Sequence, residues 1–326
     1  MKALVVGDLH AKETSPFPWN NVSVGKITRE LWRAVRTLRF VREKAEEENV
    51  DAVILLGDVF HRVENSHRVL GVIGEELREI ARDFRVIALT GNHDIIGDIS
   101  AVTSLPVHHA ITSPQTIEGW GFLPYIHSLE ELKRAIHEID ASIVFVHNTV
   151  SPAWLTTAYK EDVFIPLDGK RVIAGHVHIP QGGVKDEVIY VGTPYQNALN
   201  EAPKEIPFRV LVIDGKEHIK QIPTPFKPAI KVREEEFNAL ISLNAWEQFE
   251  GFVVESSNPE KVLKVVKELG INAVVRKKRN LTKSTPKSAL LVEFDAERFI
   301  RQTIKETLGE YALELFTAVV NAKEGK

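Results

Sequence analysis

The sequence predicts a layered α/β protein with a second, smaller α/β domain, and three observations support this fold class. Short apolar runs alternate with amphipathic stretches from residue 2 to about residue 190, which is the pattern of strands separated by helices. The pattern changes after a proline-rich segment, residues 223–228, where a domain boundary is expected. The length of 326 residues also exceeds that of an ordinary single domain.

Six apolar segments of the first domain are predicted to be strands. Their Val, Ile and Leu residues follow one another without alternation, which indicates burial on both faces. The six are residues 3–6, 52–56, 85–89, 142–146, 171–174 and 188–191. Two further strands, 209–213 and 218–222, are expected before the proline-rich segment.

Three helices are predicted between these strands. Residues 27–48 carry apolar side chains at helical spacing, and residues 66–82 begin with Ser66 as a candidate N-cap. In residues 128–137, Ser128 and Glu131 have the spacing of a capping box.

The chain is predicted to divide into residues 1–228, residues 229–294 and a C-terminal segment, residues 295–326. Residues 229–294 contain a strand at 251–255, a helix at 259–269 and a strand at 273–276. The last segment has an apolar stripe at helical spacing, which can either dock on a partner or pack on its own domain.

Composition narrows the functional classes. Hydrophobic residues make up 44% and charged residues 26% of the chain, as in ordinary globular proteins. We expect a cytoplasmic protein without a membrane partner, because no apolar run approaches the roughly 20 residues of a membrane span and no signal peptide is recognisable. The absence of cysteine excludes disulfides and thiolate metal sites. A formal net charge of -4 provides no overall attraction for nucleic acid.

Side chains that can bind metals follow five of the predicted strands. Four groups lie in short glycine-containing sequences, GDLH (7–10), GDVFHR (57–62), GNHD (91–94) and GHVH (175–178). Between the third and the fourth of these stands a lone histidine at 147. In α/β sheets the loops beyond the carboxyl ends of the strands converge on one crevice. The preceding glycines suit a backbone that turns sharply or approaches an ion closely.

The candidate ligands are two aspartates, one asparagine and four histidines. This mixture of oxygen and nitrogen suits manganese, iron or zinc better than calcium or magnesium. Their number is too large for one tetrahedral ion and fits two ions that share a carboxylate. The seven are Asp8, His10, Asp58, Asn92, His147, His176 and His178.

These five blocks, in this order, resemble the signature blocks of the calcineurin-like metallophosphoesterases. The resemblance implies their layered sandwich of mixed β-sheets flanked by helices. The form GDVFHR, and the segment YVGTPYQNALNE at 190–201, are similar to the SbcD and meiotic-recombination-eleven DNA repair nucleases, most of all to the phage SbcD-like subunits. The blocks cover residues 7–201.

The resemblance also implies roles for individual residues. Asp8, His10, Asp58 and His178 would hold one ion, and Asp58, Asn92, His147 and His176 the second, with Asp58 bridging. His93 would be a catalytic non-ligand that stabilises charge at phosphorus or protonates the leaving oxygen, and His61 would help to orient the phosphate. For His93 and His61 the alternative is a hydrogen bond that only supports a ligand.

The function implied is a manganese-dependent DNA exonuclease and endonuclease of double-strand-break repair and recombination. It would act as a homodimer with an SbcC-like, Rad-fifty-type ATPase, and residues 229–294 would form a capping domain that positions DNA. A phosphatase or cyclic-nucleotide phosphodiesterase is the alternative, because the same ions hydrolyse many phosphate esters. A non-catalytic subunit that binds DNA ends is a third possibility.

Overall fold

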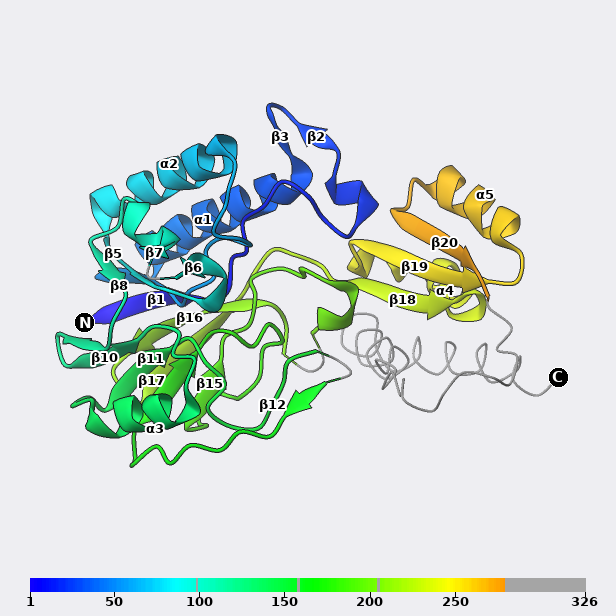
Figure 1. Ribbon diagram of the computed structural model, residues 1–326. Coiled ribbons are helices and arrows are strands. Elements are labelled where there is room, and N and C mark those ends of the chain that lie inside the picture. The colour runs from blue at the N-terminus through cyan, green and yellow to red at the C-terminus, as the bar shows by residue number, and fades with distance from the viewer. Residues whose placement is uncertain (98, 157–158, 204–205, 279–326) are drawn as a thin grey trace. The chain divides into compact units, whose positions relative to one another are not determined.

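The computed structural model of the chain, shown in Figure 1, describes residues 1–278 except 98, 157–158 and 204–205. The described residues form two compact units. Unit 1 consists of Met1–Asn197 and Ile206–Pro225, and unit 2 contains residues 198–203 and 226–278. The predicted boundary at residue 228 lies close to this division, and the predicted segment 295–326 lies outside the described residues.

The first sheet of unit 1 has six strands in the order β17-β16-β1-β4-β5-β8. Strands β1, β4, β5 and β8 are parallel, whereas β16 pairs antiparallel with both β1 and β17. The bounds are β1 Lys2–Val6, β4 Ala52–Leu55, β5 Arg85–Leu89, β8 His109–Ile111, β16 Arg209–Asp214 and β17 His218–Pro223.

The second sheet has five strands in the order β15-β14-β11-β10-β9. All but the edge strand β9 are parallel. The bounds are β9 Gln115–Ile117, β10 Trp120–Leu123, β11 Ile143–Val146, β14 Arg171–Ala174 and β15 Val188–Tyr190. Strands β4, β11 and β14 are buried along their whole length, as their continuous apolar runs predicted.

The two sheets pack face to face, and helices cover their outer faces (Figure 1). One apolar cluster contains Val5 and Ile54 from the first sheet together with Phe122 and Phe145 from the second, so it fills the space between the sheets. Helix α3 packs on the other face of the second sheet, where Ile136 joins a separate cluster. Helix α1 packs on β1 and β4 and beside α2.

Side-chain caps explain where the helices of unit 1 begin. Helix α1 is Arg29–Glu47, α2 is His67–Asp83 and α3 is Leu129–Glu138. Thr28, Ser66 and Ser128 each accept a hydrogen bond from a backbone N–H of the first turn, which satisfies a donor that the helix leaves free. The first helix was predicted two residues too early, because residues 27–28 pair with residues 23–24 instead.

Unit 2 contains a parallel three-stranded sheet in the order β18-β19-β20. Its elements are β18 Ala229–Arg233, α4 Glu234–Ser242, β19 Gly251–Ser256, α5 Pro259–Leu269 and β20 Ala273–Lys277. Phe237 and Phe252 lie in one apolar cluster with Val262. Helix α5 begins after Asn258, whose side chain caps it, and ends at Gly270 in the left-handed conformation, a common helix end.

The remaining elements are short. They are the hairpins β2 Ser23–Val24 with β3 Ile27–Thr28, β6 Ile95–Ile96 with β7 Ile99–Ser100, and β12 Ala153–Trp154 with β13 Lys160–Glu161, and the 3₁₀ turns η1 Pro18–Asn20, η2 Asn92–Asp94, η3 Ala101–Ser104, η4 Leu199–Glu201 and η5 Trp246–Gln248. Among the described residues, no helix combines the length and the apolar character that a membrane span requires.

The predicted α/β class with mixed sheets and flanking helices is confirmed. Strands β8, β9, β10 and β18 and helix α4 were not predicted. The omission of β10 matters most, because it is an interior strand of the second sheet, between β9 and β11.

Candidate metal centre

The candidate ligands follow the carboxyl ends of five parallel strands. Three of these strands, β1, β4 and β5, belong to the first sheet, and β11 and β14 belong to the second. Asp8 and His10 follow β1, Asp58 follows β4, Asn92 follows β5, His147 follows β11, and His176 and His178 follow β14. The packing of one sheet on the other therefore brings the two sets of loops together.

One group of donors gathers Asp8, His10, Asp58 and His178. One ligand atom from each residue lies within 4.8 Å of the others. His10 Nε2 is 2.9 Å from His178 Nε2 and 3.5 Å from Asp58 Oδ2. Asp8, His10 and Asp58 are buried. This is the set that the resemblance implied for the first ion.

A second group gathers around Asn92. Its Oδ1 lies 3.1 Å from His147 Nε2 and 2.8 Å from His176 Nδ1. His147 Nε2 is also 3.4 Å from Asp58 Oδ1. Asp58 therefore faces the first group with Oδ2 and the second group with Oδ1, as a bridging carboxylate would.

One buried atom of this cluster fits a cation. In the part of the chain that the structure describes, Asp8 Oδ2 has no hydrogen-bond partner. A buried polar atom without a partner costs about 1–3 kcal/mol, and such atoms are uncommon in folded proteins. Carboxylate oxygens together with neutral imidazoles are ligands that divalent transition metals prefer. The donor cluster is therefore compatible with divalent metal ions.

The backbone at the ligands is strained. His10, Asp58 and His176 have φ values of 47°, 49° and 69°, in the left-handed region that side chains with a Cβ disfavour. Strain of this kind persists where the surrounding structure fixes the residue and is typical of functional sites.

Two of the glycines before the ligands stand where a side chain would collide with neighbouring atoms. A Cβ on Gly57 would lie 2.5 Å from His147 Nδ1, and a Cβ on Gly91 would collide with Asp58. Gly57 has a φ of 97°, so both its conformation and its contact exclude a side chain. At Gly91 the close approach alone is the reason.

Two histidines of the cluster are held neutral. Burial lowers the pKa of His176 to about 4, and the positive charge of His147 adds to this effect. Burial and the neighbouring His178 lower the pKa of His10 well below its usual value. A neutral imidazole is the form that binds a metal.

His147 behaves in the opposite way. Burial by itself would lower its pKa, but the carboxylate of Asp58 outweighs this effect and raises the pKa to about 9. The same interaction lowers the pKa of Asp58, although burial opposes it. His147 Nδ1 lies 2.5 Å from the carbonyl oxygen of Leu56, which can only accept a hydrogen bond, so Nδ1 is the donor and Nε2 faces Asp58 and Asn92.

Asp94 connects two of the ligand loops. Its carboxylate accepts hydrogen bonds from Phe60 N at 3.2 Å and from Gly91 N at 3.0 Å. Burial, and then the nearby charge of Asp58, raise the pKa of Asp94 to about 7. Asp94 thus holds the GDVFHR loop against the GNHD loop.

His93 and His61 lie beside the first donor group. Their ring centres are 4.8 Å and 5.5 Å from that of His10, and 5.6 Å from one another. His93 Nδ1 is 2.8 Å from the carbonyl oxygen of His61. His93 N also donates to Asp58 Oδ1 at 2.8 Å. Both histidines are thus adjacent to the candidate ligands.

Three residues near the cluster were not singled out from the sequence. Tyr125 follows β10, which was not predicted, and its ring centre lies 5.9 Å from that of His176. Tyr195 donates from its hydroxyl to the carbonyl oxygen of Leu9 at 2.5 Å. Lys12 follows the GDLH block by two positions. Two of them had a signal in the sequence: Lys12 lies beside the first block, and Tyr195 lies within the segment 190–201.

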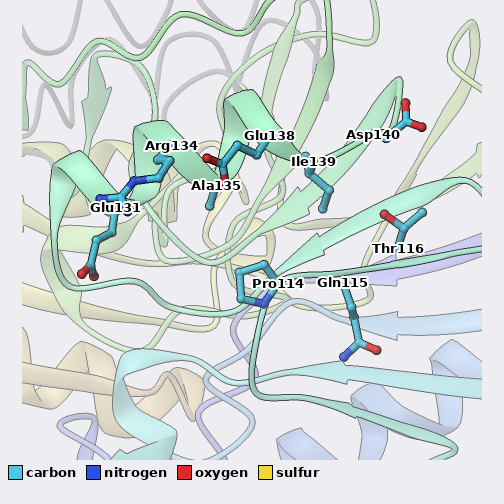
Figure 2. Close-up of a pocket in the computed structure, with 9 residues that line it drawn as sticks. All are labelled: Pro114, Gln115, Thr116, Glu131, Arg134, Ala135, Glu138, Ile139 and Asp140. Atoms are coloured by element: carbon cyan, nitrogen blue, oxygen red, sulfur yellow. The ribbon is translucent and has the colours of Figure 1, made fainter.

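A cavity of about 440 Å³ lies elsewhere in unit 1. Figure 2 shows it between α3, which contributes Arg134 and Glu138, and the edge strand β9 with Gln115 and Thr116. None of the candidate ligands lines this cavity, so it does not mark the metal centre.

Two facing sheets with a buried donor cluster at their strand ends form a site that is compatible with divalent metal ions. The sequence pattern of the family described as calcineurin-like phosphoesterase matches residues 1–180, more than half of the chain, and the chain belongs to this family. It is therefore a hydrolase of phosphoester bonds, and the family resemblance of the five blocks is confirmed.

The chain is similar to one repair protein in sequence, and a comparison with solved structures found a nuclease. The DNA double-strand break repair protein Mre11 of Archaeoglobus fulgidus is 25% identical in an alignment over 217 positions, and the alignment covers 55% of this chain and 49% of that protein. The chain thus matches about half the length of this relative. The crystal structure of the Pseudomonas putida nuclease MPE aligns with 68% of this chain and 87% of its own, at 16% identity and a TM-score of 0.32, a likeness too low to support a structural argument.

Proposed function

We propose that the protein is a two-metal, manganese-dependent DNA nuclease that acts as both exonuclease and endonuclease. The observation that carries the proposal is Asp58, which turns one carboxylate oxygen toward each of two donor groups. Such an arrangement suits two ions that act together at phosphorus. The similarity to an Mre11 repair protein favours DNA as the substrate.

The two donor groups would hold one ion each, with Asp58 shared. Asp8, His10 and His178 complete the first group, and Asn92, His147 and His176 complete the second. Bound divalent ions supply Lewis acidity and an activated water near neutral pH. The left-handed backbone at His10, Asp58 and His176 fixes these side chains before the ions bind, which reduces the cost of ordering the site.

His93 would be the proton donor of the reaction. The carbonyl oxygen of His61 can only accept, so His93 Nδ1 carries a proton and donates it at 2.8 Å. This bond fixes the ring and leaves Nε2 as the atom that can transfer a proton, from the imidazolium form, to a leaving oxygen.

His61 would orient the substrate phosphate. Burial, and then the charge of Lys12, lower its pKa to about 4, so it is neutral at pH 7. Its ring is stacked near that of His93. A neutral imidazole can donate one hydrogen bond to a phosphate oxygen.

The wider role that we propose is double-strand-break repair and recombination. The chain would act as a homodimer in the cytoplasm, with an SbcC-like, Rad-fifty-type ATPase, and residues 229–294 would cap and position DNA. The similarity to Mre11 supports this role, and the chain contains no P-loop sequence of its own.

A manganese-dependent assay on two substrates tests the proposal. End-labelled duplex DNA reports exonuclease activity, and circular single-stranded DNA, which has no ends, reports endonuclease activity. We expect cleavage of both with manganese and of neither with EDTA. Rapid hydrolysis of p-nitrophenyl phosphate without cleavage of either DNA would instead identify a phosphatase.

A further inference from the structure

Lys12 lies beside the candidate active site because two ligand loops pair along their backbones. Ala11 forms a parallel bridge with Phe60. Ala11 N donates to Val59 O at 2.9 Å, and His61 N donates to Ala11 O at 3.3 Å. This pairing places Lys12 next to His61.

A buried ion pair network holds the Lys12 side chain. Its Nζ lies 3.8 Å from Glu30 Oε1, and the two side chains are 11% and 1% exposed. Glu30 is held in turn by Arg33, whose Nη1 donates to Glu30 Oε2 at 2.9 Å. The Lys12 side chain is thus largely buried beside a carboxylate that Arg33 holds in place, which limits its conformational freedom before any substrate binds.

His61 connects Lys12 to the candidate active site, because Lys12 and His61 are the next residues after the bridged pair Ala11 and Phe60. The ring of His61 lies 5.5 Å from His10 and 5.6 Å from His93. A fixed positive charge therefore stands next to the proposed phosphate-orienting residue, one ring away from the first donor group.

We propose that Lys12 binds a backbone phosphate of the nucleic-acid substrate, next to His61. The inference rests on the proposed nuclease function and adds a residue that none of the five sequence blocks contains. A lysine ammonium is a point charge suited to phosphate, and a side chain ordered in advance loses less conformational entropy on binding.

The test is the salt dependence of DNA cleavage by Lys12→Gln. We would measure kcat/KM on a labelled single-stranded oligonucleotide with manganese at several KCl concentrations. One lost phosphate contact should reduce the slope of log kcat/KM against log [KCl] by about 0.7. The KM should rise about tenfold at low salt, with a smaller change in kcat.

A matched control comes from the same segment of the chain. Lys26 is exposed in the turn between β2 and β3, and Lys26→Gln removes the same charge. This variant should keep the slope and the KM of the wild-type protein.

Lys12 could instead serve only to balance the buried charge of Glu30. In that case Lys12→Gln would lower the melting temperature and leave the KM and the salt slope unchanged, which would overturn the inference. If Lys12→Gln does not fold, Lys12→Arg keeps the charge near Glu30 but moves the donor atoms. An unchanged KM in that variant would also overturn the inference, and a KM raised at least threefold would support it.

The failure of the proposed function gives a different result. A wild-type protein that cleaves no DNA would refute that function itself.

Discussion

Both units contain parallel strands connected by helices, but their polar side chains differ in burial. Beyond the strands of unit 1, Asp58 and His147 are almost fully buried and face one another. In unit 2, Lys231 and Glu255 pair across two strands at 2.9 Å, but both are exposed, at 48% and 39%. Exposed pairs of this kind contribute little to stability. Parallel strands linked by helices therefore do not by themselves create a site; buried, convergent polar groups do.

The two units also differ in which residues adopt the left-handed backbone conformation. In unit 2 the described left-handed residues are Asn244 and Gly270, residue types that adopt this conformation at low cost. Among the described residues of unit 1, six residues with a side chain adopt it. Three of them, His10, Asp58 and His176, are candidate ligands, and the others are Asn49, Glu118 and Asp168. Unit 1 thus places this unfavourable conformation at three of its candidate ligands, whereas unit 2 contributes no candidate ligand.

The largest effect on activity is expected from Asp58→Ala, which tests whether the buried cluster of unit 1 is a metal site. The variant removes the carboxylate shared by both donor groups, so we expect DNA hydrolysis to fall by at least about a thousandfold. Isothermal titration calorimetry should show weaker manganese binding. Asp83→Ala, which removes an exposed carboxylate at the end of α2, is the control. Wild-type manganese affinity in Asp58→Ala would show that the buried cluster does not bind metal.

His93→Gln separates catalysis from metal binding. Hydrolysis should fall by about 10²- to 10⁴-fold, the usual contribution of a general acid, whereas manganese affinity should stay within about twofold. His67→Gln alters an exposed histidine at the start of α2 and should behave as the wild type. Full nuclease activity of His93→Gln with manganese supplied would refute the assigned role.

Metal affinity should rise with pH because of His147. Its raised pKa of about 9 means that it carries a proton at neutral pH, and a metal must displace that proton. His176, with a pKa of about 4, is already neutral and releases none. Between about pH 6 and pH 8 the affinity should increase up to about tenfold per pH unit. Calorimetry in buffers of different ionisation enthalpy measures the proton released; binding without proton release at pH 7 would contradict the prediction.

The smallest effect is expected in unit 2. Asn258 caps α5 by accepting a hydrogen bond from Lys261 N at 3.4 Å, so Asn258→Ala should destabilise the protein by about 1 kcal/mol. Urea unfolding measures this change. Manganese affinity should be unchanged, since unit 2 contributes none of the seven candidate ligands. A loss of manganese binding in Asn258→Ala would contradict the conclusion that the metal site belongs to unit 1 alone.

Much of the fold was predictable from local pattern. The strands of unit 1 that lead to the ligands were found because their apolar runs end in polar, metal-capable residues. Strand β10 was missed because it has only four residues, Trp120–Leu123, one of them a glycine, and because its hairpin with β9 was not recognised. Its place in the sheet comes from pairing with β11, 20 or more positions along the chain, which no local pattern reveals.

By itself, the sequence determined which residues can bind metal and that they follow strands, because residue type and apolar run length are local properties. The tertiary structure decided the rest. Only the packing of two separate sheets brings Asp58 between His10 and His147. There the Asp58 carboxylate raises the pKa of His147, whereas burial lowers the pKa values of His10 and His176. The same packing places Lys12 beside His61. These are consequences of distance and desolvation between segments far apart in the chain, which the order of residues does not contain.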